Sequence, residues 1–152
     1  MFAMPALADS LKDEIAPTSK LRVAIAVSSA GGIADYYSEH HGGFWVVVEN
    51  EKIVGMFGLE PSDDSAMELR RMYVDPDVRR RGIARRMLEF AEQECRGRNR
   101  SRLDLSTSEL QREALALYEN AGYVRVREEA AVVASNKTIG GGIRRYHFTK
   151  VL

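Results

Sequence analysis

Residues 72–88 read MYVDPDVRRRGIARRML, and this stretch decides how the chain folds. A strand-like run ends before Pro76, and apolar residues with helical spacing begin after Gly82. Three adjacent arginines (Arg79–Arg81) lie between them, an arrangement that charge repulsion opposes unless water or an anion lies among them. The free N–H groups and the dipole of a helix start attract anions. Gly82 and the small Ala84 would let a phosphate approach those amides, so the stretch predicts a strand, an anion-binding turn and a helix.

Known phosphate-binding motifs do not describe this turn. A P-loop would end in Gly-Lys-Ser/Thr, and a dinucleotide fingerprint would need a third glycine and an acidic residue after the next strand. The alternative is a solvated basic turn that caps a surface helix, which would leave Gly82 and Ala84 without a purpose.

Outward from this stretch, β-forming runs alternate with amphipathic segments. The expected strands are residues 21–27, 44–49, 52–59, 67–74, 102–106, 123–133 and 143–152, and the expected helices are residues 33–41, 82–94 and 110–121. From residue 44 the order is three strands, a helix, a strand, a helix and two strands. This order predicts an α/β (α+β) fold: a mixed, mostly antiparallel central sheet flanked by helices, with a β-α-β unit at its centre.

Local signals add detail to these expectations. Asn50-Glu51 is expected to turn a β-hairpin, residues 61–65 a polar loop, and residues 136–142 the last strand connection. Near the front of the chain, three apolar residues have helical spacing: Leu7, Leu11 and Ile15. Pro17 would end this helix. In the helix at 110–121 we expect inward-facing Leu110, Ala114, Leu117 and Ala121, with Gly122 at its C-terminal end.

Length and composition indicate one soluble domain over residues 1–152. The chain has 152 residues, 45% hydrophobic and 29% charged, with zero formal net charge and one cysteine, Cys95. The zero charge argues against nucleic acid as a partner, and a single cysteine excludes an intrachain disulfide. No apolar run approaches the ~18 residues of a membrane span. We therefore expect a cytoplasmic protein without a membrane partner, for which a homodimer is a possible assembly.

The arginine-rich turn resembles a known family motif. Residues 79–84, RRRGIA, resemble the R/Q-x-x-G-x-G/A motif of the GNAT superfamily of N-acetyltransferases. LYENAGY (117–123) resembles that family's second signature, and FWVVVENEKIVGMFGLEP (44–61) is similar to the hairpin before its cofactor strand. The resemblance covers residues 43–152, and TSELQREALALYENAGY (107–123) is locally similar to camello-like members.

The resemblance implies acetyl-CoA as co-substrate and direct acetyl transfer to a primary amine in a small molecule, peptide or protein. It places the pantetheine arm along the backbone of Met72, Tyr73 and Val74. The pyrophosphate would lie on the turn, whose residues are Arg79, Arg80, Arg81, Gly82, Ile83 and Ala84. The alternative is an acyl-CoA sensor that binds without turnover.

Two side chains are candidates for the proton transfers. Tyr118 resembles the family tyrosine that protonates the leaving thiolate, since a phenol can donate to a thiolate. The alternative is that it packs beside Ala114 and Ala121. Glu68 is the candidate general base for the ammonium acceptor; the alternatives are a strand glutamate that is exposed or paired with Arg70, and a water as base.

Two further residues are expected near the cofactor. Gln111 stands where relatives have an asparagine that touches the cofactor arm, although Ser108-x-x-Gln111 also has the pattern of a capping box. Ala114 would matter by being small near the pantetheine. No metal is expected, because the three histidines lack suitable ligand spacing.

The front of the chain departs from the family pattern. Relatives begin with a strand and two helices that wall the acceptor site, whereas residues 1–42 are short and rich in alanine and serine. Tyr36, Tyr37 and Trp45 are candidates for the front of that pocket, without an assigned place or role. The acceptor therefore stays undefined by the sequence.

Overall fold

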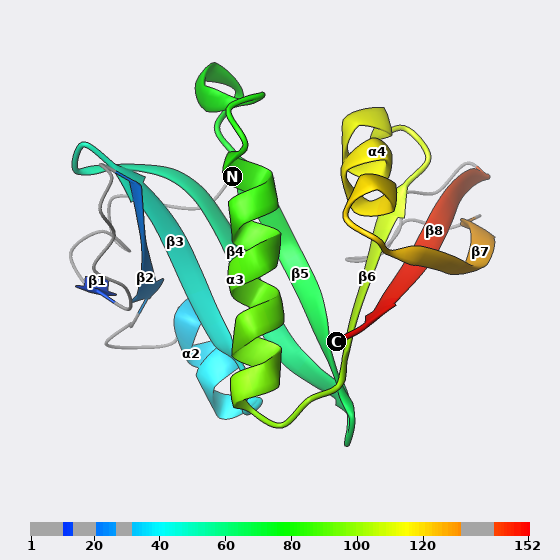
Figure 1. The fold of residues 1–152 in the computed structure, drawn as a ribbon, viewed down its shortest axis with the longest axis horizontal. Helices are drawn as coiled ribbons and strands as arrows, with labels where there is room; N and C mark the ends of the chain where they lie inside the picture. Colours follow the sequence, from blue (N-terminus) through cyan, green and yellow to red (C-terminus); the bar gives the residue numbers. More distant parts are fainter. Residues whose placement is uncertain (1–10, 14–20, 27–31, 132–141) are drawn as a thin grey trace. The chain divides into compact units, whose positions relative to one another are not determined.

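The computed structural model of the chain describes residues 11–13, 21–26, 32–131 and 142–152. Its strands are β1 (Leu11–Asp13), β2 (Leu21–Ala26), β3 (Gly43–Glu49), β4 (Lys52–Asp63), β5 (Ala66–Val74), β6 (Arg102–Ser108), β7 (Val124–Ala131) and β8 (Ile143–Val151). The helices are α2 (Ile33–Glu39), α3 (Ile83–Gly97), α4 (Arg112–Asn120) and the 3₁₀ helix η1 (Pro76–Val78). The strands form a mixed, mostly antiparallel sheet in the order β1-β2-β3-β4-β5-β6-β8-β7 (Figure 1).

The chain divides into two compact units. The first comprises Met1–Pro61 and Leu69–Ala91, and the second comprises Ser62–Glu68 and Glu92–Leu152. Strand β5 and helix α3 each contribute residues to both units.

The first unit is built on the antiparallel strands β1 to β4 and the later part of β5. Strands β3 and β4 are joined by Asn50 and Glu51, whose φ angles are 51° and 63°. Two successive left-handed residues form the turn whose twist matches a two-residue hairpin. The hairpin predicted at residues 44–59 is thus confirmed.

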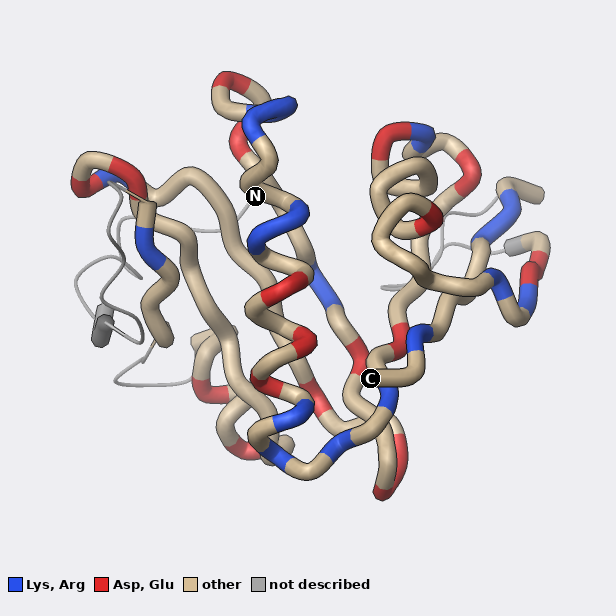
Figure 2. The backbone as a smooth tube through the Cα atoms, in the orientation of Figure 1, with Lys and Arg blue, Asp and Glu red and all other residues tan. Residues whose placement is uncertain are grey.

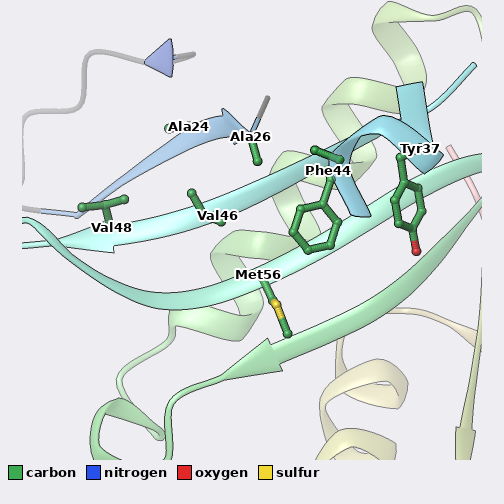
Figure 3. Close-up of a cluster of buried hydrophobic side chains, with 8 residues drawn as sticks. Ala24, Ala26, Tyr37, Phe44, Val46, Val48 and Met56 are labelled. Carbon is green, nitrogen blue, oxygen red and sulfur yellow. The ribbon is translucent and has the colours of Figure 1, made fainter. Parts of the chain in front are cut away.

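Alternate residues of β3 face two different apolar layers of this unit. Trp45 stacks on Phe57 at a ring separation of 5.5 Å and meets Phe90 of α3 edge-on at 5.8 Å. On the other face, Phe44 packs with Tyr37 of α2 and with the remaining buried members of one cluster, which are Ala24, Ala26, Ala34, Val46, Val48 and Met56 (Figure 3). The sheet of the first unit is therefore covered by α3 on one face and by α2 on the other.

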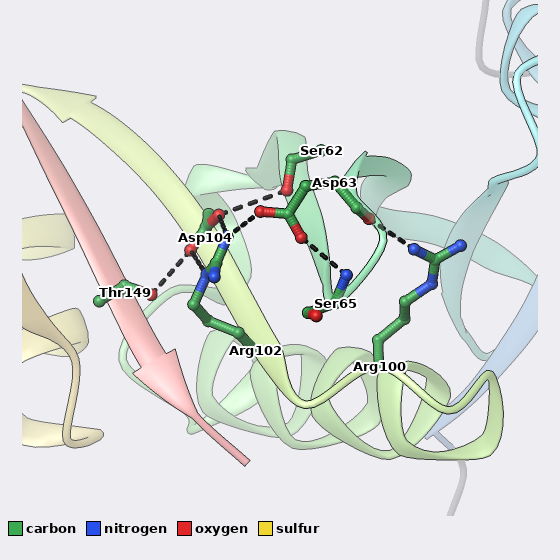
Figure 4. A network of polar contacts seen from close by, with 7 residues as sticks. All are labelled: Ser62, Asp63, Ser65, Arg100, Arg102, Asp104 and Thr149. Atoms are coloured by element: carbon green, nitrogen blue, oxygen red, sulfur yellow. Dashed lines mark hydrogen bonds and ion pairs between the residues drawn. The ribbon is translucent and has the colours of Figure 1, made fainter.

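The second unit joins the start of β5 to the C-terminal strands. Residues 66–68 of β5 run parallel to β6, and β6, β8 and β7 continue the sheet as antiparallel neighbours. A polar network centred on Asp104 fastens these strands (Figure 4). Asp104 accepts hydrogen bonds from Arg102 at 3.0 Å and from Thr149 at 2.7 Å, and Arg102 also pairs with Asp63.

A second polar cluster lies inside this unit. Glu92 is only 6% exposed, and its carboxylate accepts hydrogen bonds from Tyr123 at 3.0 Å and from Lys150 at 3.0 Å. A buried carboxylate needs such partners, because an unpaired charge in the interior is strongly destabilising. These two hydrogen bonds join α3 to the residue before β7 and to β8.

Most element predictions are confirmed, and several local ones are wrong. Residues 61–63 continue β4 instead of starting a loop. Leu11 lies in a strand rather than in the predicted helix, whose other marker residues lie outside the described residues. Leu110 is 64% exposed, because α4 begins only at Arg112 and leaves Leu110 in the preceding turn. Of the turn predicted at residues 136–142, only Gly142 is described, with a φ of 77°.

Candidate functional site

The segment from β5 to α3 is an ordered turn held by backbone and side-chain hydrogen bonds. The Asp75 N–H donates to the Val54 carbonyl at 2.8 Å, which ties the end of β5 to β4. The Asp75 carboxylate in turn accepts from the Asp77 N–H at 2.9 Å and caps η1. Aspartate before Pro76 suits this position, since it accepts from backbone amides at a helix start.

Arg79 and Arg81 are each hydrogen-bonded to another part of the first unit. The Arg79 Nε donates to the Val74 carbonyl at 3.1 Å. The Arg81 guanidinium forms two parallel hydrogen bonds with the Glu49 carboxylate, at 2.9 and 2.6 Å, and this pairing raises the arginine's pKa. The charges are thus spread over separate contacts, and Figure 2 shows the basic segment of the turn running into α3.

The backbone at Gly82 opens the start of α3. Gly82 has a φ of 79°, and a Cβ placed on it would meet no atom within 4 Å. The first bond of the helix runs from the Arg86 N–H to the Gly82 carbonyl at 3.1 Å. The amides of the first helical turn, from Ile83 onward, therefore have no acceptor within the helix, and the space over Gly82 is open for an anion. Glycine serves this turn by its left-handed conformation as well as by its size.

Arg71 has an unusual backbone conformation within strand β5. This residue has a φ of 55°, in the left-handed region that side chains other than glycine seldom adopt. Arg70 pairs with Glu60 of β4, whereas Tyr73 packs on the apolar cluster that contains Tyr37 and Phe44. A left-handed residue departs locally from the extended backbone of a strand. Met72, Tyr73 and Val74, which follow Arg71, are half-buried.

Glu68 lies on the same strand but belongs to the second unit. Its Cα is in register with that of Asp104 on β6, and its side chain is half-buried. Arg70, the alternative partner for Glu68, is found paired with Glu60.

Tyr118 is the buried aromatic of α4. It is 7% exposed and lies near Tyr123 and Phe148, with ring separations of 6.1 and 6.0 Å. Burial raises the pKa of Tyr118 to about 12, and the nearby Arg145 opposes this only partly. The phenol is therefore protonated at neutral pH, which a proton donor requires, and it also packs as the alternative interpretation expected.

The capping box predicted at the start of α4 is wrong. Strand β6 extends to Ser108, and the helix begins four residues later with Gln111 as its N-cap and no side-chain cap. The Ser108 hydroxyl instead accepts from the Leu110 N–H at 3.1 Å. Gln111 is hydrogen-bonded to Thr107 through its side-chain oxygen. Ala114 is half-buried on α4.

The predicted site residues thus divide between the two units. The first unit holds the continuous segment from Met72 to Ala84, with the strand, the turn and the open helix start together. The second unit holds Glu68, Gln111, Ala114 and Tyr118. Sequence reasoning assigned no role to Arg71 or Tyr37. In the sequence, Tyr37 is marked only by its aromatic neighbour Tyr36. Nothing in the sequence indicates the left-handed backbone of Arg71.

Histidines do not form a metal site in the described part of the chain. No group of three or more His, Cys, Asp and Glu side chains there could hold a metal ion. The His147 imidazole meets the Glu129 carboxylate at 2.8 Å, and the His40 ring is hydrogen-bonded to the Tyr36 carbonyl at 2.6 Å. Cys95 is fully buried, and burial raises its pKa to about 11.

Comparison with known families decides the affiliation. The acetyltransferase (GNAT) family model matches residues 9–123, which include the front region, the turn and α4. The chain belongs to the GNAT acetyltransferase family. The match starts well before residue 43, so the front of the chain is part of the family's pattern.

Relatives of this GNAT chain include human N-acetyltransferase 8, which is 37% identical over 93 residues, covering 58% of the chain and 41% of that protein. N-acetylaspartate synthetase from Danio rerio is 39% identical over 102 residues, covering 63% of the chain and 35% of that protein. The chain thus spans about half or less of the length of these curated relatives.

The GNAT fold is also found in solved structures. A GNAT family acetyltransferase from Elizabethkingia anophelis with acetyl-CoA bound superposes with a TM-score of 0.72 at 15% identity, covering 88% of this chain and 99% of that chain. At this identity the likeness concerns the fold. Among the described residues, no helix is long and apolar enough to cross a membrane.

Proposed function

We propose that the protein is an acetyl-CoA-dependent N-acetyltransferase that transfers the acetyl group directly to a primary amine. In this proposal residues 1–152 act as one catalytic domain. The observation that carries it is the open start of α3. There Gly82, with a φ of 79° and free space above it, follows a turn anchored by Arg79 and Arg81. Family membership adds independent support, since the relatives are named as N-acetyltransferases.

The residues of the turn suit a pyrophosphate. Backbone N–H groups at the helix start supply donors and partial positive charge, and open space allows close approach. Contacts within the protein hold the turn in place. Arg79 is hydrogen-bonded to the Val74 carbonyl, and Arg81 to the Glu49 carboxylate. We therefore assign the main phosphate contacts to the amides of Arg81, Gly82, Ile83 and Ala84, and a long-range electrostatic contribution to the guanidinium groups of Arg79, Arg80 and Arg81.

The strand before the turn is assigned to the pantetheine arm. Arg71, whose φ is left-handed, lies just before Met72, Tyr73 and Val74 on β5. An extended ligand can pair with the backbone of a strand as another strand does. Gln111, the residue before α4, and Ala114 of α4 are proposed to contact the same arm.

Acetyl-CoA supplies an activated thioester, and the chain supplies a proton acceptor for the amine and a hydrogen-bond donor for the leaving sulfur. Glu68 is proposed to accept a proton from the ammonium form of the acceptor, directly or through a water. A half-buried carboxylate on β5 is suited to this role, because the amine must lose its proton before it can attack.

Tyr118 is proposed to donate a hydrogen bond to the departing thiolate. With a pKa of about 12 the phenol is protonated at working pH. It is a weaker acid than a thiol, whose pKa is ~8.5. Stabilisation of the sulfur by a hydrogen bond is therefore the main contribution expected of Tyr118, and complete proton transfer can follow from solvent.

A calorimetric titration with acetyl-CoA tests the proposal, with NADPH and ATP as control anions and a thiol-release assay with amine acceptors as the second readout. Selective binding of acetyl-CoA together with amine-dependent release of CoA would support it. Equal binding of all three anions, or none, would contradict it. Selective binding without turnover on any amine would favour the acyl-CoA sensor.

A further inference from the structure

Strand β7 (Val124–Ala131) forms an edge of the sheet in the second unit, and none of its residues belongs to the proposed site. Among the strands that the structure describes, it has a neighbour, β8, on one side only (Figure 1). Each of residues 124–130 is exposed, whereas an antiparallel strand commonly packs one face on the core. The outer side of such a strand presents backbone N–H and C=O groups with which another strand can pair.

Two valines lie on this edge without being packed. Val124 and Val126 are each 61% exposed. The register with β8 shifts between Arg125 and Arg127, so Val126 is the extra residue of a β-bulge and is not matched to a residue of β8. Apolar side chains of this size gain free energy when another surface covers them.

Beyond the bulge, one ring nitrogen contacts two opposite charges of the strand. Arg127 and Glu129 lie on the same face of the sheet, because both contact the His147 Nε2, at 3.2 and 2.8 Å. In the part of the chain that the structure describes, neither side chain has another hydrogen-bond partner. A ring nitrogen either donates or accepts a hydrogen bond, so His147 satisfies only one of them at a time. The other side chain keeps hydrogen-bonding capacity at the edge of the sheet.

We propose that a second copy of the chain pairs with β7 in antiparallel orientation, about a two-fold axis that passes through Glu128. In this register Arg127 of each copy lies opposite Glu129 of the other. The axis keeps every side chain on its own face of the sheet, so the two charges meet directly. Opposite charges in facing positions stabilise an antiparallel pair of strands, and the symmetry provides the contact twice.

The charges along β7 favour this register over its neighbours. Facing side chains must lie on one side of the sheet, so a two-fold axis has to pass through a residue. An axis through Arg127 would bring two arginines face to face. An axis through Glu129 would bring two carboxylates together and would leave Arg127 without a facing carboxylate. At Glu128 the two facing carboxylates are each paired with Arg144 of their own copy, at 3.0 Å, which offsets their repulsion.

The same contact covers apolar surface at the edge. With the axis through Glu128, Val126 lies across from Ala130 of the second copy, so the bulge residue gains a neighbour. Strand β7 has eight residues, a small contact compared with the ~1,600 Å² of a typical stable complex. We therefore expect a dissociation constant in the micromolar range. Charges and bulges also protect strand edges from association, and the experiments below separate the two roles.

Analytical ultracentrifugation of the full chain tests the association, at concentrations from about 1 µM to about 1 mM. Arg127→Glu and Glu129→Arg each place like charges opposite one another, and the double variant exchanges the two charges. Arg96→Glu, on the exposed last turn of α3, changes the net charge as Arg127→Glu does and is the matched control.

We expect the wild type and Arg96→Glu to dimerise with the same dissociation constant. Each single reversal at the contact should raise that constant about tenfold or more, because it alters two symmetric contacts. The double variant should recover most of the affinity, since the effects of facing residues do not add.

Cysteine cross-linking tests the register. Glu128→Cys places one thiol of each copy at the axis, where facing Cβ atoms are ~5 Å apart, close enough for a disulfide or a short bifunctional thiol reagent. Val124→Cys is the control, because its two thiols would lie roughly 25 Å apart. The native Cys95 is buried and does not compete. We expect Glu128→Cys to form a covalent dimer and Val124→Cys to remain monomeric under denaturing conditions.

Three results would overturn the inference. They are a wild type that stays monomeric over the whole concentration range, a dissociation constant that neither charge reversal changes, and cross-linking of Val124→Cys as efficient as that of Glu128→Cys. The wild-type and cysteine measurements remain decisive if a charge-reversal variant fails to fold. All of these measurements are made without acetyl-CoA, so they do not depend on the proposed function.

Discussion

Arg81 and Glu49 are joined by two hydrogen bonds of 2.9 and 2.6 Å, which tie the turn before α3 to the end of β3. The guanidinium is thereby held by a protein carboxylate, although its sequence position resembles that of a phosphate-binding residue. Substitutions can show whether Arg81 contacts the ligand directly or acts by holding the turn in place.

We expect Arg81→Gln and Glu49→Gln to weaken acetyl-CoA binding by similar, severalfold amounts, and the double variant to be no worse than either. This follows if the pair acts as one anchor, since the effects of residues that act through a shared contact do not add. Calorimetric titration of the four proteins measures it. A much larger loss for Arg81→Gln, with a reduced dependence on salt, would instead indicate direct contact with a phosphate.

Gly82→Asp should reduce acetyl-CoA binding by tenfold or more while the fold is kept. The new carboxylate would lie at the helix start, where a pyrophosphate needs close approach, and like charges repel strongly at short range. Gly82→Asn is the matched control, because asparagine has nearly the same shape and also tolerates a positive φ. Equal affinity of the two variants would show that charge at this position does not matter.

Tyr118→Phe should lower kcat about 10- to 100-fold with acetyl-CoA affinity changed less than twofold. The wild-type rate should show no loss from Tyr118 ionisation below about pH 11, because the pKa of the phenol is raised to about 12. Steady-state rates from pH 6 to pH 10.5 check both statements. A rate that is unaffected by the substitution would assign Tyr118 to packing alone.

Glu68→Gln should lower kcat/KM by about 10²-fold or more if the carboxylate acts as general base. The loss should shrink as pH rises, because the free amine then forms without a base. Rates with a weakly basic acceptor provide the comparison, since such an amine needs no deprotonation at neutral pH. Wild-type rates in Glu68→Gln at pH 7 would leave the task to a water.

The free energy of unfolding should fall as the pH rises above about 9. Burial raises the pKa of Cys95 from 9.0 to about 11 and that of Tyr118 from 10.0 to about 12. In both cases the folded state holds the proton more tightly than the unfolded state. The stability that these two protonated groups contribute is therefore complete below pH 9 and is lost as pH rises through 11 to 12. Urea unfolding at pH 7, 9, 10 and 11 measures this, and Cys95→Ala should remove the earliest part of the decline.

Sequence patterns predicted the elements well where the signal was local. The hairpin at residues 44–59, the helix after Gly82 and the left-handed glycine after α4 each follow from side-chain spacing or backbone preference. The exposure of Leu110 was missed because it depends on how far β6 extends, which pairing with β8 decides. Tertiary pairing of this kind overrides the intrinsic preference of a short segment.

The candidate site was predictable only in part. The turn had a visible pattern, because small residues follow a run of arginines at the start of a helix. Contacts between distant residues, such as Arg81 with Glu49 or Tyr37 with Gly58, leave no spacing in the sequence. The left-handed Arg71 was also invisible, since nothing about an arginine between Arg70 and Met72 indicates an irregular strand.

The burial of Cys95 has a practical consequence. It is the single thiol of the chain, fully buried and with its pKa raised to about 11. A thiolate rather than a thiol reacts with disulfide dyes, so the folded protein should remain colourless with such reagents. Released CoA can then be followed continuously against a low background. The slow reaction of one further equivalent of dye would measure the rate at which unfolding or local opening exposes Cys95.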